Sequence, residues 1–403
     1  MDLYQKSQVR KIKNEHDFRF TKSLGQNFLV SREVICEIIE ASQIGESDLV
    51  IEIGPGMGTL TGLAAQRARK LIAVEIDSDL IPILKETLAE YGKVAVISGK
   101  DAAANGKVVA INGKDDAVND YLQERSGSAP DAGAGAAGDA AEADIVIVND
   151  DILNTDLAAM IQAAKAADPG IEGVRIIGNL PYYITTPIIM KILREDLPAE
   201  KVPAGATDAG ATDAGATDAG ATDAGATDVG ATDAGEADAG EAEIQPGGNS
   251  ALADSITIMM QKEVADRIKA APGSKTYGAL SVAVQYYCEV SEVCEAPAEC
   301  FEPRPKVDSE VLRLDIRGQR AVSVKDEDLF FDCVKAGFSQ RRKTLSNCMK
   351  NLSRESLSNS LSKEEITAVL ADAGIEPVRR AETLSIEEFG ALADSVYRLK
   401  KNQ

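Results

Sequence analysis

The stretch that decides the fold is Leu49 to Gly58, which reads L-V-I-E-I-G-P-G-M-G. A run of β-prone apolar residues is followed by Gly54, Gly56 and Gly58, and then by a segment of helical character, 59–69. This order predicts a buried parallel strand that enters a glycine turn and then a helix. Such a turn needs unusual backbone dihedrals and lets the backbone approach a ligand closely. The stretch is therefore a candidate nucleotide site.

The spacing of the glycines and two nearby acids indicate which nucleotide. A dinucleotide fingerprint is G-x-G-x-x-G, whereas this turn reads G-x-G-x-G, and Glu52 stands two positions before its first glycine. A second predicted strand, 71–76, carries Glu75 near its end, where a carboxylate can accept hydrogen bonds from both hydroxyls of a ribose. Two acids suit a cationic ligand better than a pyrophosphate. S-adenosylmethionine, with its sulfonium and ammonium groups, is the cofactor that this pattern favours.

Composition sets further limits on the protein. The 403 residues leave room for two domains of ~150 residues each. No apolar run approaches the ~20 residues of a membrane span, and the first ten residues lack the apolar core of a signal peptide. We therefore expect a soluble cytoplasmic protein with no membrane partner. The six cysteines form no C-x-x-C pair and the chain has one histidine, so we expect no metal site and no disulfide framework.

The net charge of −22 would normally argue against a nucleic-acid partner. Two segments, 99–143 and 199–250, carry −14 of it and leave −8 for the rest. The second contains six copies of G-A-T-D at a five-residue period. Neither has the large apolar residues that a core needs, so both are predicted to be flexible acidic insertions. They are either solvated loops or acidic segments that mimic nucleic acid and compete with it for a basic groove.

The position of the third strand is the one point that the sequence after Glu75 leaves open. Beyond Glu75 the pattern predicts a helix over 78–91 and then two candidates for the third strand, 94–98 and 145–149. The second is favoured because Asp151 follows it closely and the next strand arrives at normal spacing. Asp151 is then an acid at a strand end that can receive the amino group of the cofactor's adenine. The first candidate is expected to be an edge strand or a hairpin arm of the insertion.

A second chemical centre follows the predicted strand 174–177 and consists of Asn179, Leu180, Pro181 and Tyr182. Asn179 offers a side-chain acceptor and Leu180 a backbone carbonyl that the following proline restrains. Two acceptors that hold the hydrogens of an exocyclic amine can direct its lone pair at a sulfonium methyl. Stacking on Tyr182 would add ~1–3 kcal/mol. The centre indicates methyl transfer to a nucleobase amine without a general base, and a turn that serves only packing is the alternative.

Basic side chains gather near both ends of the chain. Six of them lie within residues 6–22, and Arg341, Arg342 and Lys343 form a triplet further on. Each cluster alone is compatible with an ordinary solvated face. If the two clusters converge on one face, they form a site for phosphates despite the overall acidity.

Several segments, in order along nearly the whole chain outside the insertions, resemble the ribosomal RNA adenine dimethyltransferases of the KsgA type. The segments are Leu24 to Leu29, Val50 to Gly58, Val74 to Asp77, Asp151 to Leu153, Gly178 to Pro187, Gln261 to Val264, Tyr277 to Ser281, Phe301 to Ser309 and Arg341 to Thr344. The resemblance implies an α/β fold, with a Rossmann-like class I methyltransferase domain followed by a small, mostly helical domain. It also implies transfer of methyl groups from S-adenosylmethionine to N6 of two adjacent adenines in the hairpin near the 3′ end of 16S ribosomal RNA. That reaction would contribute to maturation of the small subunit.

The resemblance also implies roles for individual residues. The cofactor site would be formed by Asn27, Leu29, Gly54, Gly56, Glu75, Asp151 and Asn179. The catalytic centre would comprise Asn179, Leu180, Pro181 and Tyr182. The RNA would be bound by Tyr182 stacking on the target base, Phe301 covering its other face, and Arg341, Arg342 and Lys343 on phosphates. The chain departs from the family at Leu24, where the family usually has phenylalanine, and in the two insertions.

The predicted organisation is a basic N-terminal arm (1–22), the methyltransferase domain (23–260) and a helical C-terminal domain (261–403), whose segments 361–373 and 384–399 have helical apolar spacing. Two alternatives stay open. One is the related large-subunit enzyme of the macrolide-resistance type, although Q-K-E-V and Y-G-A-L-S are associated with the small-subunit group. The other is a non-catalytic ribosome-assembly factor of the same fold. We expect a monomer whose partner is the immature small ribosomal subunit.

Overall fold

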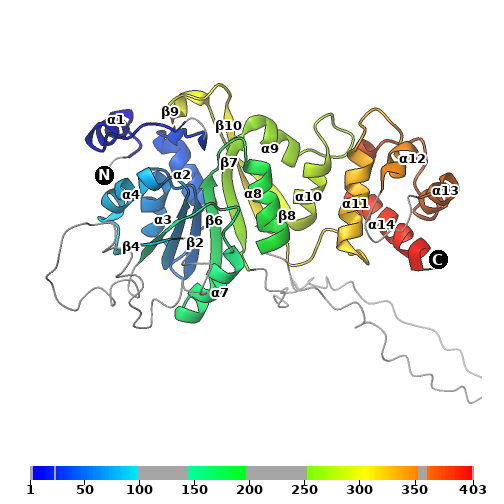
Figure 1. The fold of residues 1–403 in the computed structure, drawn as a ribbon, viewed down its shortest axis with the longest axis horizontal. Coiled ribbons are helices and arrows are strands. Elements are labelled where there is room, and N and C mark those ends of the chain that lie inside the picture. Colours follow the sequence, from blue (N-terminus) through cyan, green and yellow to red (C-terminus); the bar gives the residue numbers. More distant parts are fainter. Residues whose placement is uncertain (1–2, 22–23, 99–143, 197–251, 353–360, 402–403) are drawn as a thin grey trace, which may run out of the picture.

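The computed structural model describes residues 3–21, 24–98, 144–196, 252–352 and 361–401, so both predicted insertions lie outside the described residues. At its centre is an eight-stranded sheet in the order β4-β5-β3-β2-β6-β7-β10-β8 (Figure 1). Its strands are β2 (Asp48–Ile53), β3 (Lys70–Glu75), β4 (Val94–Ser98), β5 (Ile145–Asn149), β6 (Gly173–Asn179), β7 (Ser255–Gln261), β8 (Cys288–Ala296) and β10 (Ser309–Ile316).

The central strand β2 is buried on both faces of the sheet. Leu49, Ile51 and Ile53 point into one hydrophobic cluster, whereas Val50 points into the other. Such a continuous apolar run is typical of a parallel strand covered by helices on both sides. The first face is covered by α7 (Leu157–Ala167) and α8 (Thr185–Lys191), and the second by α2 (Arg32–Ala41), α3 (Thr59–Ala65) and α4 (Ile81–Leu88).

The strands from β4 to β7 in the sheet all run parallel, so their carboxyl ends share one edge. The preferred choice of third strand is confirmed, because β5 pairs with β3. The other candidate, β4, pairs in parallel with β5 alone and is an edge strand rather than a hairpin arm. The acids at the ends of β3 and β5 are therefore neighbours at the edge where ligands of open α/β sheets bind.

The sheet does not end at residue 260, where the domain boundary was predicted. Two strands beyond it, β10 and β8, extend the same sheet, with β10 antiparallel to both β7 and β8. Strand pairing with β7 over seven residues holds this extension, and the first four residues of β10 are all buried. Among the described residues, the elements from Glu327 onward are helices and 3-10 turns without strands.

The helices after the sheet pack onto it through aromatic rings. Tyr286 and Tyr287 of α10 stack on Phe330 and Phe331 of α11, with ring centroids 4.7 and 5.7 Å apart for the pairs Tyr286–Phe330 and Tyr287–Phe331. One continuous hydrophobic cluster thus joins the sheet to the C-terminal helices at the right of Figure 1. The C-terminal helices are α11 (Glu327–Phe338), α12 (Leu345–Cys348), α13 (Lys363–Asp372) and α14 (Ile386–Lys401). Two other helices, α9 (Lys262–Ile268) and α10 (Ala279–Tyr287), lie between β7 and β8 in the chain.

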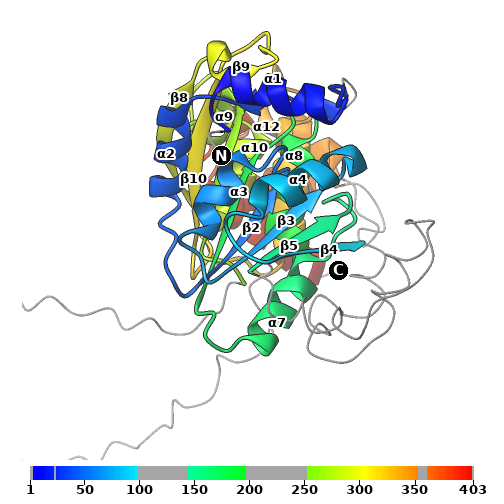
Figure 2. The ribbon, with the colours of Figure 1, turned by 90° about the vertical axis from the view of Figure 1, so that its left-hand side faces the viewer.

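The predicted N-terminal arm contains a helix, α1 (Lys6–Glu15). Its apolar side chains Val9 and Ile12 are buried with Phe18 and Phe28, which explains why a segment rich in basic residues is folded onto the protein. Figure 2 shows α1 beside β9 (Phe301–Glu302), which pairs with β1 (Phe28–Leu29).

Shorter turns complete the described chain. They are the 3-10 turns Ser78–Leu80, Ala298–Cys300, Met349–Asn351 and Ala381–Thr383, and the π-helical turn Ile192–Asp196. Within the described ranges, no helix combines the length and the apolar character needed to cross a lipid bilayer.

Candidate functional site

The glycine turn between β2 and α3 has the backbone conformation that its sequence predicts. Gly54, Gly56 and Gly58 have φ angles of +69°, +61° and +90°, a region that residues with a side chain rarely adopt. A Cβ atom on Gly56 would also lie 2.9 Å from the ring of Phe28. Only glycines fit both the backbone dihedrals and the limited space of this turn. No side chain therefore separates the backbone of the turn from a ligand.

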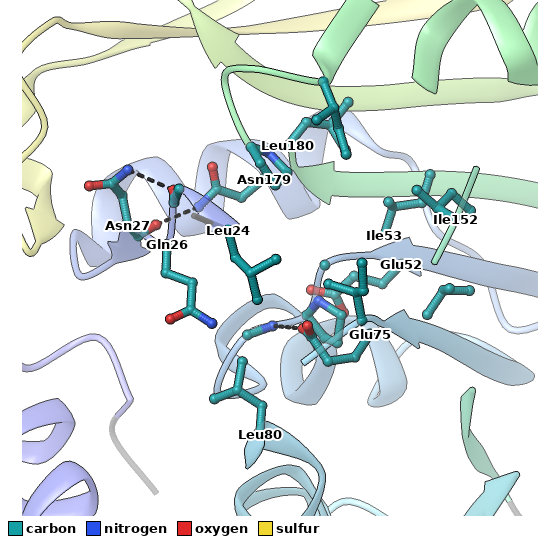
Figure 3. A pocket seen from close by; sticks show the side chains of 18 of the residues that line it. Leu24, Gln26, Asn27, Glu52, Ile53, Glu75, Leu80, Ile152, Asn179 and Leu180 are labelled. Atoms are coloured by element: carbon teal, nitrogen blue, oxygen red, sulfur yellow. Dashed lines mark hydrogen bonds between the residues drawn. The ribbon is translucent and has the colours of Figure 1, made fainter. Parts of the chain in front are cut away.

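Glu75 lies at the end of β3 and holds this turn in place. One oxygen of its carboxylate accepts a hydrogen bond from the backbone N–H of Gly56 at 3.2 Å (Figure 3). The other oxygen accepts one from Asp77 N–H at 2.9 Å. The side chain is almost fully buried. Burial raises the pKa of Glu75 to about 7, since the hydrogen bonds offset only part of the cost of burying its charge.

Glu52 of β2 is a second buried carboxylate beside the same pocket. One of its oxygens, Oε2, has no hydrogen-bond partner among the described residues, and neither has the hydroxyl of buried Thr61. Burial, with a smaller contribution from the charge of Glu75, raises the pKa of Glu52 to about 8. A buried carboxyl without a cationic partner is costly. The pocket therefore has an unmet preference for positive charge.

Asn179 is oriented by residues of the N-terminal segment, Gly25 and Asn27. Its amide nitrogen, Asn179 Nδ2, donates to the backbone carbonyl of Asn27 at 2.9 Å, and Asn27 Nδ2 in turn donates to Gly25 O at 2.9 Å (Figure 3). With its nitrogen engaged, Asn179 has its oxygen Oδ1 left as an acceptor. No described residue donates to that oxygen.

Gln26 stands between the N-terminal segment and the acids. Its Nε2 donates to Asp77 Oδ2 at 2.6 Å, while its Oε1 accepts from the backbone N–H of Thr21 at 2.8 Å. Because Asp77 also donates to Glu75, Gln26 ties the arm to the acid at the end of β3. Sequence reasoning considered Gln26 only as a side chain able to reach a ligand, since spacing does not reveal this contact.

The residues after Asn179 are held from several sides. Leu180 is buried and its N–H donates to Met259 O in β7 at 3.2 Å. The carbonyl of Pro181 accepts from Thr185 Oγ1 at 3.0 Å and from Ile184 N–H at 3.2 Å. No described residue donates to the carbonyl of Leu180, so that oxygen remains an acceptor beside Asn179 Oδ1.

Tyr182 is anchored by a residue that sequence reasoning did not single out. Its hydroxyl and that of Ser309 are 2.6 Å apart, and Ser309 is fully buried at the start of β10. The pKa of Tyr182 is raised, mainly by burial. Ser309 closes the F-E-P-R-P-K-V-D-S segment. That motif was the available signal, but only the fold brings it against Tyr182.

One pocket of about 1010 Å³, measured to its open mouth, gathers most of the predicted site residues. Asp151 lines it too, with its Oδ1 already accepting from the N–H of Leu153 at 2.9 Å. The predicted residues that line it are Asn27, Leu29, Gly54, Gly56, Glu75, Asp151, Asn179, Leu180, Pro181 and Tyr182.

Two predicted RNA contacts lie elsewhere. The ring of Phe301 is fully buried in the hydrophobic cluster below the sheet, and Phe301 pairs with Leu29 in the small sheet, so it does not face the pocket. The expectation that it covers the target base is wrong, because strand pairing with β1 turns it inward. Arg341, Arg342 and Lys343 are exposed between α11 and α12 and do not line the pocket; the guanidinium of Arg341 donates to the carbonyl of Lys275.

Comparison with known proteins decides the family. The model of the family described as "Ribosomal RNA adenine dimethylase" matches residues 17–111 and 139–392. The chain belongs to the ribosomal RNA adenine dimethylase family. The match leaves out 112–138, which lies within the first predicted insertion, and it spans both the glycine turn and Asn179 to Tyr182.

Curated relatives extend the dimethylase match over almost the whole chain. A protein of Clostridioides difficile named "Ribosomal RNA small subunit methyltransferase A" is 35% identical over 96% of this chain and 94% of its own length. A protein of the same name from Alkaliphilus oremlandii is 36% identical, over 96% of each chain.

A solved structure confirms the fold. The dimethyladenosine transferase from Plasmodium falciparum superimposes with a TM-score of 0.54 at 20% identity, over 93% of this chain and 98% of that one. The chain has the expected α/β fold, a Rossmann-like methyltransferase sheet followed by a helical C-terminal region.

Proposed function

We propose that the protein transfers methyl groups from S-adenosylmethionine to N6 of two adjacent adenines in the hairpin near the 3′ end of small-subunit ribosomal RNA. Its membership of the adenine dimethylase family and the small-subunit name of its bacterial relatives support this reaction. We propose further that it acts as a monomer, in the cytoplasm, on the immature small ribosomal subunit. The reaction there contributes to maturation of that subunit.

The residues of the pocket fit this cofactor. Glu75 and the glycine turn suit a ribose, and Asp151 at the neighbouring strand end suits an adenine amino group. A cationic ligand would favour the ionised form of Glu52, whose Oε2 has no hydrogen-bond partner among the described residues. When bound, S-adenosylmethionine supplies a methyl group on a sulfonium that leaves as a neutral thioether.

The chain's own contribution to the reaction is to orient the amine. Asn179 Oδ1 and the carbonyl of Leu180 accept the two N–H hydrogens of the target N6 amine, so its lone pair is turned toward the methyl group. Tyr182 stacks on the base, and Ser309 holds that ring by its hydroxyl. The reaction needs no histidine, because the orientation of the amine exposes its lone pair for attack before any proton is lost. After each methyl transfer the nitrogen releases one proton to solvent.

The observation that carries the proposal is the orientation of the Asn179 amide. Because Nδ2 donates to Asn27 O, the side chain presents an acceptor and not a donor to the pocket. An acceptor suits an amine, which has two hydrogens to donate. A donor in that place would suit a carbonyl oxygen instead.

The exposed triplet Arg341, Arg342 and Lys343 is proposed to contact phosphates of the folded RNA. Phosphate contacts position a nucleic acid, while base contacts select the nucleotide. Since α10 and α11 fix the C-terminal helices on the sheet, these charges lie at a constant place relative to the pocket. Binding of RNA should weaken as salt rises, by ~0.7–0.9 log units per log unit of salt for each phosphate neutralised.

Methyl transfer from labelled S-adenosylmethionine tests the proposal. Immature small subunits and, separately, large-subunit RNA are incubated with the protein, and the labelled nucleoside and its position are identified. We expect dimethyladenosine in the 3′-terminal hairpin of the small-subunit RNA. Label in large-subunit RNA would transfer the assignment to the resistance type. Bound cofactor without transfer to either RNA would favour a non-catalytic assembly factor.

The affinity for S-adenosylmethionine is expected to rise with pH between about 6 and 8. Glu52 and Glu75 have pKa values raised to about 8 and about 7 in the empty pocket, so both are partly protonated there. Ribose hydroxyls and a sulfonium favour the ionised carboxylates, so binding must release protons below these values. Each carboxyl group that must ionise when the cofactor binds changes the affinity by at most about tenfold per pH unit.

Calorimetry at pH 6.5 in two buffers of different ionisation enthalpy measures this proton release directly. Glu75→Gln should release fewer protons than the wild-type protein. Proton uptake, or an affinity independent of pH, would contradict the assignment of both acids to the cofactor site.

Replacing Ser309 by alanine is expected to lower the rate of methyl transfer about 3-fold to 10-fold. The substitution removes one hydrogen bond, worth ~0.5–1.5 kcal/mol, that orients the ring of Tyr182. The measurement is single-turnover methylation at saturating cofactor. Tyr182→Phe should lose a similar factor, and the double variant should lose no more than either alone. Additive losses would show that the two hydroxyls act separately.

A further inference from the structure

Two tyrosines that are adjacent in the chain both line the pocket, but their side chains have different surroundings. Tyr182 is half-buried and its hydroxyl is held by Ser309, whereas Tyr183 is 58% exposed. Both line the pocket, so Tyr183 lies at its mouth. Within the described part of the chain, the Tyr183 hydroxyl has no hydrogen-bond partner. The exposed ring therefore serves no evident purpose in the fold.

The apolar surface around Tyr183 is concentrated at the pocket. The described residues include five exposed large hydrophobic side chains: Ile76, Leu153, Tyr183, Val307 and Val378. Two of them, Ile76 and Tyr183, line the pocket, and Leu153 directly follows a lining residue. Val307 is two residues from the serine that holds Tyr182. The exposed side chains of Ile76 and Tyr183 at the same pocket indicate a binding surface, whereas scattered ones need no explanation.

The ring of Tyr183 is supported by the N-terminal segment. A Cβ atom on Gly25 would lie 3.4 Å from Cδ1 and Cε1 of the ring, and 3.8 Å from Pro181 Cβ. Gly25 has a φ of +60°, so a residue with a side chain would be strained there. The ring therefore lies beside Gly25, where an added Cβ atom would just reach it, while more than half of the side chain stays open to solvent. An exposed ring beside the pocket is suited to stacking.

We propose that Tyr183 is the stacking platform for the nucleotide next to the adenine that Tyr182 holds. This inference rests on the proposed function and specifies how its substrate is bound. An enzyme that acts on two adjacent adenines must keep one of them outside the pocket while the other reacts. The outer base has been pulled away from its neighbour in the RNA stack, and an aromatic ring at the mouth replaces that lost contact.

An aromatic platform also suits the order of events. The outer base is an unmodified adenine in one half of the reaction and a dimethyladenine in the other. Dimethylation removes both N6 hydrogens, so a site that read them by hydrogen bonds would accept only one of the two forms. Stacking reads the face of the ring and accepts both. Tyr183 can therefore hold the neighbour of either target.

The test compares Tyr183→Ala with Tyr183→Phe on immature small subunits. Loss of a stacking contact worth ~1–3 kcal/mol predicts that kcat/KM for the subunits falls about 5-fold to 150-fold in Tyr183→Ala. Tyr183→Phe keeps the ring and should restore most of that loss. Val378→Ala, which removes an exposed side chain in the turn after α13, is the matched control and should behave as wild type.

Two further measurements separate the possible roles of the ring. The charge of Asp151 contributes to the raised pKa of Tyr183, so the ring is near the predicted adenine site, and covering the cofactor is its competing role. Calorimetry with S-adenosylmethionine decides this: an unchanged Kd in Tyr183→Ala supports the platform, and a loss of affinity equal to the loss in kcat/KM overturns it.

The second measurement uses a hairpin RNA with 2-aminopurine beside the target adenine. Quenching of its fluorescence on binding should be present in wild type and Tyr183→Phe and weaker in Tyr183→Ala. Equal quenching in all three would overturn the inference. If wild-type protein methylates neither adenine, the proposed function itself fails, and that outcome is seen before any variant is made.

Discussion

Asn179→Ala is expected to lower the rate of methyl transfer by about 10²–10³-fold, the effect of removing one preorganised polar group from a developing charge. The oxygen Oδ1 is the acceptor that the pocket offers to the target amine, and Asn27 O fixes its direction. An alanine removes the acceptor and leaves the base stacked but not oriented. The measurement is single-turnover transfer to small subunits at saturating cofactor.

Two controls make the result specific. Asn154→Ala changes an exposed asparagine outside the pocket and should leave the rate as in wild type. Cofactor affinity in Asn179→Ala, measured by calorimetry, should change far less than the rate, because Glu75, the carboxylate proposed to hold the ribose, remains. Full methyl transfer by Asn179→Ala would refute the proposed mechanism.

Glu75→Gln is expected to weaken the binding of S-adenosylmethionine by at least about 100-fold. Hydrogen bonds to a charged group contribute ~1.5–3 kcal/mol each, and the carboxylate of Glu75 is proposed to accept two from the ribose. Glutamine keeps the size of the side chain but replaces one acceptor oxygen by a donor and removes the charge. Titration calorimetry at pH 8, where the wild-type carboxylate is ionised, gives the largest difference.

The loss of affinity is not expected to come from unfolding. The pKa of Glu75 is raised from 4.5 to about 7 in the folded protein, so burying its charge lowers the stability of the fold. This loss of stability begins above pH 4.5 and increases up to pH 7. At ~1.4 kcal/mol per pH unit, Glu75→Gln removes a cost of up to ~3 kcal/mol. We therefore expect it to be at least as stable as wild type at pH 8 in thermal unfolding.

A matched acid tests whether the effect belongs to the pocket. Asp79 is an exposed carboxylate one short turn beyond Glu75, and it does not line the pocket. Asp79→Asn should bind the cofactor as wild type does. Equal losses in both variants would indicate a general effect of negative charge rather than hydrogen bonds to the ribose.

The parts of the site that could be predicted are local ones. The glycines of the turn, Glu75 and Asp151 follow from strand ends and from backbone conformations that are encoded within a few residues. In a parallel sheet the carboxyl ends meet at one edge, so a correct reading of the strands places these residues together. The choice of 145–149 as the third strand was therefore enough to bring Asp151 to the pocket.

The prediction for Phe301 failed because the direction of its ring does not depend on neighbouring residues in the sequence. A motif places an aromatic residue near the site but does not say which way its ring points. Pairing of β9 with β1 puts the ring of Phe301 in the core, while the exposed ring at the mouth is that of Tyr183. Such orientations depend on pairing between strands that are far apart in the sequence, and local sequence patterns do not predict that pairing.

The sequence by itself determined the central parallel strand, the glycine turn, the acids at the strand ends and the family, because each depends on residues close together in the chain. The tertiary structure decided which distant groups act as a pair: Asn179 with Asn27, 152 positions apart, and Tyr182 with Ser309, 127 positions apart. It also decided that the sheet continues to Ile316 and that Glu52 and Glu75 have raised pKa values. These properties depend on burial and on contacts between remote segments, and such contacts exist only once the chain is folded.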